Sequence, residues 1–428
     1  MALDQLAWQM RTWPRLPIFK SRQRRHFRLV AVGVLICLSL VIYLLFLHLR
    51  SGPRTWTVET TVHQKNTKSS HSPAYPLKPF PDSPLQPSQP PSTHSMARRP
   101  WLAAVICAAQ DVERRMLIRS TWMRLFRHIP FDPRFVVSNP GPGWAELVSF
   151  ENSTFGDLIV LDHIPEDDMT ANTIKTLELY KWLINRGQKY EFVTKLDTDL
   201  WMNAPAFWHK YLLPRLSSAT GHLTATVNRT VIGQLYFSGS GYNTFAHGSM
   251  YTITWDMVQL LVSLQDRFNV VTGEDAAVGI LMHRGNEMAN FVNFRGDEKF
   301  DYDDSDSRQD GSAWARSSTH SQAISHAVYG NNVVAVHMLK DKRLWTKVAN
   351  CFDEDGIKRM PPLIRPERSP SLVVRLNDFI YSLGLSRSYV SMMDTIPREL
   401  LTYRDGHWVC DNIWDLGTSQ EGFNSLGG

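Results

Sequence analysis

The sequence predicts an α/β domain with a largely parallel sheet, carried behind a membrane anchor and an extended stem. Short apolar runs alternate with helical segments after residue 100, an uncharged apolar run lies near the N-terminus, and a proline-rich stretch separates the two. We expect a basic cytoplasmic tail over residues 1–28, a transmembrane helix over 29–49, a stem over 50–100, an α/β domain over 101–350 and a C-terminal extension over 351–428.

Composition excludes several classes of protein. With 43% hydrophobic residues in 428, the chain can bury a substantial core, and four cysteines are too few for a disulfide scaffold. The basic residues number 46 against 41 acidic ones, but seven basic and one acidic lie before Leu29, which leaves 39 basic and 40 acidic residues in the rest. The positive charge therefore belongs to the tail, and we expect no nucleic-acid partner.

Residues 29–49 carry no formal charge and are long enough, at roughly 30 Å as a helix, to cross the hydrocarbon core of a bilayer. The run is longer than the apolar part of a cleaved signal peptide. Positive charges concentrate before it, which predicts a cytoplasmic N-terminus and a single-pass type II membrane protein. The remainder of the chain would then be luminal or extracellular.

The stem has ten prolines and eight serines between residues 51 and 100, a composition typical of an extended, disordered spacer. Two glycosylation sequons follow it, at Asn152 and Asn228, and both are compatible with a luminal glycoprotein.

The α/β domain should begin with a buried strand, because WLAAVICAA at residues 101–109 is short and apolar. Strands alternating with helices favour a mostly parallel sheet. Further strands are expected at 134–138, 157–162 and 190–196, and helices at 112–126, 141–150 and 168–186.

The fourth strand runs directly into Asp197-Thr198-Asp199. In an open α/β sheet, ligands bind outside the carboxyl ends of the strands. Carboxylates two residues apart can share a Mg²⁺ or Mn²⁺ ion, or divide their contacts between a cation and sugar hydroxyls. A solvated turn after a strand is the alternative.

Four segments in order make the chain resemble the β-1,3-galactosyltransferase-like family, glycosyltransferase family 31, which also holds β-1,3-N-acetylglucosaminyltransferases and the Fringe enzymes. KLDTDLWMN, which contains the acidic triplet, looks like the metal-and-nucleotide motif of the family. The other segments are Arg115–Trp122 (R-x-x-I-R-x-T-W), Phe245–Thr254 (FAHGSMYTIT, similar to S-G-G-G-Y-V-L-S) and Gly273–Gly279 (similar to E-D-V-x-x-G).

The chain departs from the family pattern in two of these segments. The middle acid of the triplet is Thr198, and the glycine-rich segment keeps only Gly248. Residues 236–241 (YFSGSG) offer a competing match to that segment, and residues 351–428 match nothing in the family.

The resemblance implies a nucleotide-sugar-binding domain of the GT-A type with a divalent cation, Mn²⁺ or Mg²⁺. Asp199 would bind the metal, and Asp197 would assist it or contact the ribose of the donor. His337, which closes the apolar run 333–337, resembles the histidine that completes such a metal site. A structural histidine is the alternative, and His247, His283 and His326 are competitors.

The resemblance also assigns a catalytic base and a donor-binding set. Asp275 matches the second acid of the family's E-D motif and would take the proton of the acceptor, with Glu274 as the alternative base and a helix cap as the structural reading. Donor binding is expected from Arg115, Arg119, Asp197 and Gly248. For the two arginines a solvated face or an internal ion pair stays open.

The function implied is inverting, metal-dependent transfer of a hexose, with galactose favoured, from a UDP-sugar to a glycan acceptor through a β-1,3 linkage, by a Golgi type II membrane protein. The alternatives are an N-acetylglucosaminyltransferase of the same family and a catalytically silent, lectin-like or scaffolding relative.

Two other features have plainer interpretations. The acidic run 301–306 lacks the glycine of a calcium-binding EF-hand loop and is expected to be a solvated loop. In an oxidising compartment Cys351 and Cys410 are candidates for a disulfide, with Cys107 buried in the first strand, but the odd number of luminal cysteines leaves the pairing open.

Overall fold

The computed structural model describes residues 99–167, 173–218, 222–238, 243–294, 298–308, 310–316, 326–362 and 396–418. The expected tail, membrane helix and stem lie outside these residues. Within the described ranges, no helix has both the length and the apolar character needed to cross a membrane. The described residues all belong to the compact unit formed by residues 89–428.

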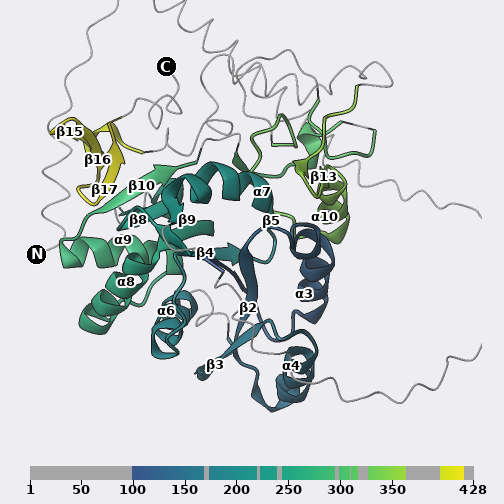
Figure 1. Ribbon diagram of the computed structural model, residues 1–428, viewed down its shortest axis with the longest axis horizontal. Coiled ribbons are helices and arrows are strands. Elements are labelled where there is room, and N and C mark those ends of the chain that lie inside the picture. Colours follow the sequence, from purple (N-terminus) through teal and green to yellow (C-terminus); the bar gives the residue numbers. More distant parts are fainter. Residues whose placement is uncertain are drawn as a thin grey trace, which may run out of the picture. The chain divides into compact units, whose positions relative to one another are not determined.

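A ten-stranded mixed sheet organises this unit, in the order β15-β16-β17-β10-β8-β9-β4-β1-β2-β3 (Figure 1). The strands are β1 (Trp101–Ile106), β2 (Phe131–Asn139), β3 (Leu158–Pro165), β4 (Phe192–Asp197), β8 (Thr230–Ser238), β9 (Asn243–Thr254), β10 (Ala289–Asn293), β15 (Leu401–Arg404), β16 (His407–Cys410) and β17 (Trp414–Gly417).

The first four strands of the chain form a parallel block, in which β1 pairs with β2 and β4, and β2 pairs with β3. β9 then pairs antiparallel with both β4 and β8. The expected α/β class is therefore confirmed, and all four expected strands are present with edges shifted by a few residues.

Helices cover both faces of the sheet (Figure 1). The helix expected over 112–126 is interrupted, because Thr121 has non-helical torsion angles and its hydroxyl donates to the carbonyl of Leu117. The helices are α3 (Val112–Ile118), which continues as a π-helical segment (Arg119–Met123), α4 (Gly141–Phe155), α6 (Lys175–Asn185), α7 (Ala204–Phe207), α8 (Trp255–Phe268), α9 (Glu274–Gly285) and α10 (Lys342–Ala349).

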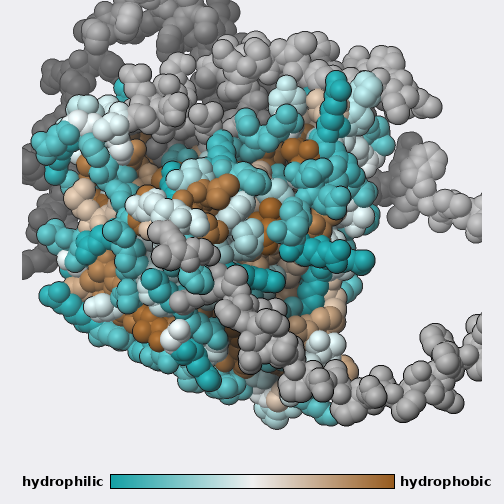
Figure 2. All heavy atoms as spheres, viewed as in Figure 1, coloured by the Kyte–Doolittle hydropathy of each residue, from teal (hydrophilic) through white to brown (hydrophobic). Residues whose placement is uncertain are grey.

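The sheet separates two hydrophobic cores, and alternate residues of β1 show the division. Trp101 and Val105 pack with α3, α4 and α10, whereas Leu102 and Ala104 pack with α6, α8 and α9. On the face seen in Figure 2, the coloured surface is a mixture of hydrophilic side chains and smaller apolar patches.

The expected disulfide between Cys351 and Cys410 is wrong, since both residues and Cys107 are free and buried. Cys351 belongs to the core on the α3 side of the sheet and Cys410 to the core on the α9 side. A disulfide requires Cα atoms within about 7 Å, and here the sheet separates the two thiols.

Strands β15–β17 extend the main sheet, although the sequence placed them in an extension of unknown role. β17 pairs parallel with β10, and the buried indole of Trp414 donates to the carbonyl oxygen of Thr244 at 3.1 Å. Asp411 accepts from the Thr244 hydroxyl and pairs with His283 of α9, each at 2.9 Å. The C-terminal strands thus hold α9 against the sheet.

A second sheet of three strands, in the order β11-β12-β5, lies beyond the end of β4. Its strands are β5 (Trp201–Met202), β11 (Lys299–Asp301) and β12 (Ala335–His337). The remaining short strands are β6 (Leu216–Ser218), β7 (Leu223–Ala225), β13 (Phe352–Asp353) and β14 (Gly356–Ile357).

Trp414→Ala should lower the free energy of unfolding by about 3–5 kcal/mol, because it leaves a cavity under the C-terminal strands. Urea denaturation would measure this. The matched control is Phe150→Ala on α4, an aromatic that is 71% exposed and should change stability by less than about 0.5 kcal/mol. Equal effects of the two variants would contradict the packing role of the C-terminal strands.

Candidate metal centre and active site

The acidic triplet lies at the carboxyl edge of the parallel block. Asp197 is the last residue of β4 and pairs in register with Ile106, the last residue of β1. The chain then turns through Asp199 into β5, which pairs antiparallel with β12. A backbone hydrogen bond from the amide of Leu339 to the carbonyl oxygen of Asp199, at 2.9 Å, also joins the segment after β12 to the acidic triplet.

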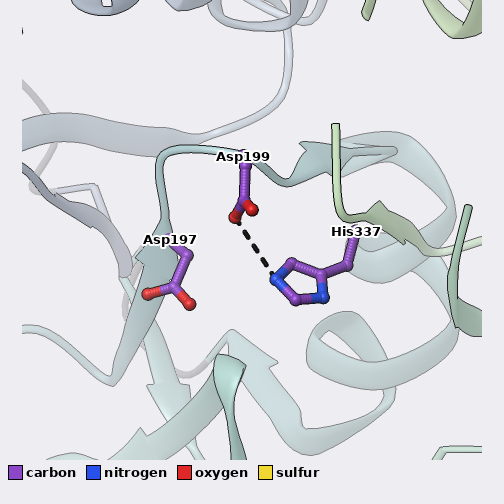
Figure 3. A group of neighbouring side chains, drawn as sticks. All are labelled: Asp197, Asp199 and His337. Atoms are coloured by element: carbon purple, nitrogen blue, oxygen red, sulfur yellow. Dashed lines mark ion pairs between the residues drawn. The ribbon is translucent and has the colours of Figure 1, made fainter. Parts of the chain in front are cut away.

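This pairing brings Asp197, Asp199 and His337 together, although more than 130 residues separate the histidine from the acids (Figure 3). One ligand atom of each side chain lies within 4.8 Å of the others. Nε2 of His337 is 3.2 Å from a carboxylate oxygen of Asp199. Two carboxylates and an imidazole form a donor set suited to Mn²⁺, so the residues fit the expected cation.

Asp301 orients His337, and the sequence analysis missed this role. Asp301 and His337 are register partners on the parallel strands β11 and β12, and the carboxylate lies 2.7 Å from Nδ1. A proton on Nδ1 bonded to a carboxylate leaves Nε2 free to bind a metal. Only the pairing of β11 with β12 reveals Asp301, which otherwise reads as the start of an acidic loop.

The electrostatics of the cluster follow from these contacts. Burial would raise the pKa of Asp199, but the hydrogen bond and charge of His337 outweigh it and lower that pKa. Burial would likewise lower the pKa of His337, yet Asp199 and Asp301 raise it above its usual range. The two carboxylates thus favour the protonated form of the imidazole, and a metal ion at Nε2 would compete with that proton.

A pocket of about 450 Å³ adjoins the cluster at the carboxyl edge of the sheet. Asp197 and Thr198 line one part of it, and Gly248 with Asp275 line another. The other lining residues come from the end of β1 and the loop after it, from β4, α6 and β9, and from the start of α9. They are Ile106, Cys107, Ala108, Asp111, Lys175, Lys195, His247, Ser249, Gly273 and Glu274.

Asp275 and Glu274 both lie in the first turn of α9 but differ in their surroundings. Glu274 is buried, paired with Lys195 at 2.9 Å and bonded by the Tyr251 hydroxyl at 3.0 Å, and burial raises its pKa. Asp275 is partly exposed and accepts from the backbone amide of Ala276. Of the two acids, Asp275 has the carboxylate available to a ligand.

Gly248 lies directly against Asp275. A Cβ atom at position 248 would lie 3.0 Å from Oδ2 of Asp275 and 3.2 Å from its Cβ. The single glycine kept from the family's glycine-rich segment therefore leaves space for this acid. Its position makes Gly248 a neighbour of the candidate base as well as part of the pocket wall.

His247 lines the pocket and contacts the buried amine of Lys299. Nδ1 of His247 lies 2.8 Å from the Ser249 hydroxyl and 3.2 Å from the Lys299 amine. Burial and the charge of Lys299 lower the pKa of His247 to about 3, and burial lowers that of Lys299 to about 8. The imidazole is thus neutral beside the metal cluster.

Arg115 and Arg119 lie outside the pocket lining. The Arg115 side chain is fully buried, pairs with Glu151 of α4 at 2.7 Å and donates to the carbonyls of Ala108 and Ala109. Arg119 pairs with Glu151 and Asp157. Of the two alternatives that the sequence left open for these arginines, the structure shows internal ion pairs. The hydrogen bonds from Arg115 to the carbonyls of Ala108 and Ala109 hold the loop that follows β1.

The other histidine competitors are engaged elsewhere. His283 pairs with Asp411, and Nδ1 of His326 lies 2.9 Å from the carbonyl oxygen of Asp301. In the part of the chain that the structure describes, Asp197, Asp199 and His337 form the cluster suited to a metal ion.

Asp301→Asn should weaken Mn²⁺ binding by about 10- to 100-fold, because the carboxylate that fixes the imidazole is lost. Calorimetric titration of the metal-free protein would measure this. Asp303→Asn is the matched control, because that side chain only accepts from the Ser305 amide, which asparagine can also do. A similar loss of affinity in both variants would refute the orienting role of Asp301.

Comparison with known proteins shows what the part of the chain around this site is similar to. Residues 113–286 match the family model described as galactosyltransferase. β-1,3-Galactosyltransferase 1 of Homo sapiens and of Mus musculus are each 26% identical over 199 residues, which are 43% of this chain and 60% of the relative. UDP-GalNAc:β-1,3-N-acetylgalactosaminyltransferase 2 of Xenopus tropicalis is 30% identical over 142 residues, 32% of this chain and 28% of the relative.

Among solved structures, the galactosyltransferase LgtC in complex with donor and acceptor sugar analogues matches 61% of this chain and 97% of its own, at 10% identity and a TM-score of 0.33. The chain spans about 60% of the length of the β-1,3-galactosyltransferases it matches. Residues 113–286 are therefore similar to the galactosyltransferase family, and the relatives matched over this part of the chain are β-1,3-glycosyltransferases.

Proposed function

We propose that this protein is an inverting, metal-dependent glycosyltransferase that moves galactose from UDP-galactose to a glycan acceptor, forming a β-1,3 linkage. The observation that carries the proposal is the juxtaposition of two groups at one edge of the sheet. The cluster of Asp197, Asp199 and His337 adjoins the pocket that Asp275 also lines. A donor bound in the pocket would have its diphosphate near the first group and its sugar near the second.

Asp197, Asp199 and His337 would hold the cation, which would supply Lewis-acid stabilisation of the leaving diphosphate. The pocket volume of about 450 Å³ lies within the range of small-ligand sites. Asp197 lines the pocket, so one carboxylate can face both the cation and the donor.

Asp275 would act as the general base. As the acceptor oxygen forms its bond to the anomeric carbon, the bond from that carbon to the phosphate oxygen breaks, and UDP leaves with the electron pair. The proton of the acceptor hydroxyl passes to Asp275. Its partial exposure in the pocket wall, compared with the buried and paired Glu274, favours Asp275 for this role.

The family supports a hexosyl donor, and the relatives point to two sugars. One group of relatives is named for galactose transfer and another for N-acetylgalactosamine transfer. N-acetylhexosamines, including N-acetylglucosamine, are therefore the alternative donors. A panel of UDP-sugars distinguishes these donors, because the sugar nucleotide from which UDP is released identifies the donor. The measurement requires no knowledge of the acceptor.

We further propose a Golgi location with the catalytic domain in the lumen and residues 29–49 as the anchor. The orientation is based on the uncharged run and on the excess of positive charge before it, and the Golgi location is based on the family resemblance together with this topology. A protease-protection assay on intact vesicles, read with antibodies to the two ends of the chain, would test the orientation.

UDP release by the purified full-length chain, measured with each UDP-sugar in Mn²⁺ and in EDTA, tests the activity. We expect metal-dependent release from UDP-galactose. Asp275→Asn should lower turnover by about 10²- to 10⁴-fold while UDP still binds, because only proton transfer is lost. Asp199→Ala should lose Mn²⁺-dependent UDP binding.

Absence of UDP binding in a folded wild-type protein would refute the proposal. Binding without turnover, for every donor and a broad glycan panel, would instead favour the silent relative, for which the replacement of the middle acid by Thr198 is the supporting observation.

Gly248→Ala should lower kcat by about 10²-fold, because the new methyl group would displace the Asp275 carboxylate. UDP and Mn²⁺ affinities should change little. Gly143→Ala on α4 is the control, since a methyl group there meets open space. Wild-type kcat in Gly248→Ala would show that the close approach to Asp275 has no catalytic consequence.

A further inference from the structure

The buried ammonium group of Lys195 lies where three segments of the active site meet. Its Nζ is 2.7 Å from a carboxylate oxygen of Asp197 and 2.9 Å from a carboxylate oxygen of Glu274. It also donates to the backbone carbonyl of Gly248. The three partners belong to β4, α9 and β9, so one side chain joins segments that are distant in the sequence.

Each partner of Lys195 adjoins a group with a proposed chemical role. Asp197 belongs to the metal cluster, and Gly248 lies against Asp275. Glu274 directly precedes Asp275 in the first turn of α9. Movement of β9 or α9 relative to β4 would therefore change the distance between the metal ligands and the candidate base.

The carboxylate oxygens of Asp197 and Glu274 have different partners. Oδ1 of Asp197 accepts from Lys195, which leaves its other oxygen for a ligand. Glu274 uses one oxygen for Lys195 and the other for the Tyr251 hydroxyl, and that hydroxyl lies 3.4 Å from the hydroxyl of Tyr180. Glu274 is thus held on both sides, from β4 and from β9.

The Nζ atom of Lys195 has three hydrogen-bond acceptors around it, which are the carboxylates of Asp197 and Glu274 and the carbonyl oxygen of Gly248. An amine with three acceptors at hydrogen-bond distance has all its donors engaged, so it is available neither as a base nor to a ligand. Its geometry is suited to holding its partners in place.

We propose that Lys195 is a positioning residue that sets the placement of Asp275 relative to the metal cluster. This inference rests on the proposed transferase function. A purely structural role would stabilise the fold through charge compensation alone, and it predicts that restoring the charge balance restores activity. A positioning role predicts that it does not.

Two variants separate these roles. Lys195→Met keeps the length of the side chain but leaves Glu274 and Asp197 without their cation, which should destabilise the protein. The double variant Lys195→Met/Glu274→Gln removes the uncompensated buried charge and should recover most of the lost melting temperature. Lys210→Met is the control, because Lys210 pairs with the buried Glu298, and neither residue lines the pocket.

Two measurements on the full-length chain distinguish a positioning role of Lys195 from a purely structural one. Hydrogen–deuterium exchange should rise in both Lys195 variants at residues 247–250 and 273–279, and remain at the wild-type rate there in Lys210→Met. In the double variant we expect kcat to fall by about 10²-fold, the cost of a small misplacement of reacting groups, with little change in the acceptor KM. Lys210→Met should keep the wild-type kcat.

Recovery of kcat together with the melting temperature in the double variant would overturn the proposal, and so would unchanged exchange at both segments. Failure of the proposed function is distinguishable from these results, because it would show as absence of turnover in the wild type. The exchange measurement needs no substrate and would still test whether Lys195 joins the segments.

Discussion

The position of β4 between a parallel and an antiparallel neighbour is the constraint on which the site depends. β4 pairs with β1 on one side and with β9 on the other, so both edges of β4 are hydrogen-bonded. Because β9 runs in the opposite direction, its residues near Gly248 lie beside the carboxyl end of β4. Asp197 therefore emerges between the end of β1 and the first half of β9, where one pocket receives residues from all three strands.

The small sheet adds the remaining part of the metal centre. β12 pairs with β5, which directly follows the acidic triplet, and β11 pairs with β12. Two short ladders thus place His337 beside Asp199 and Asp301 beside His337. Opposite charges then compensate one another: the carboxylates raise the pKa of His337, and His337 lowers that of Asp301 to about 2, although burial alone would raise it. His337 is the buried member of this set, and a buried ionised group is stable only when it is paired.

The two arginines of the R-x-x-I-R-x-T-W segment form internal ion pairs and do not line the pocket. Arg115 is held by Glu151 and by the carbonyls of Ala108 and Ala109. Because Ala108 lines the pocket, Arg115 fixes the loop that follows β1 and does not face the pocket itself. The planar guanidinium group of arginine can pair with a buried carboxylate as well as with a phosphate. The motif alone therefore does not show which of the two partners the arginine has.

The sequence by itself determined the α/β class, the four parallel strands and the acidic triplet at a strand end, because these depend on local apolar patterning. It also identified Asp199, His337 and Asp275 through short motifs, and the structure brings the first two together and places the third in the adjoining pocket. Only the tertiary structure decided that Asp301 orients His337, that Cys351 and Cys410 are free, and that Arg115 and Arg119 pair internally. Each of these depends on pairing between distant strands or on which face of the sheet a side chain occupies, and no local sequence pattern encodes either.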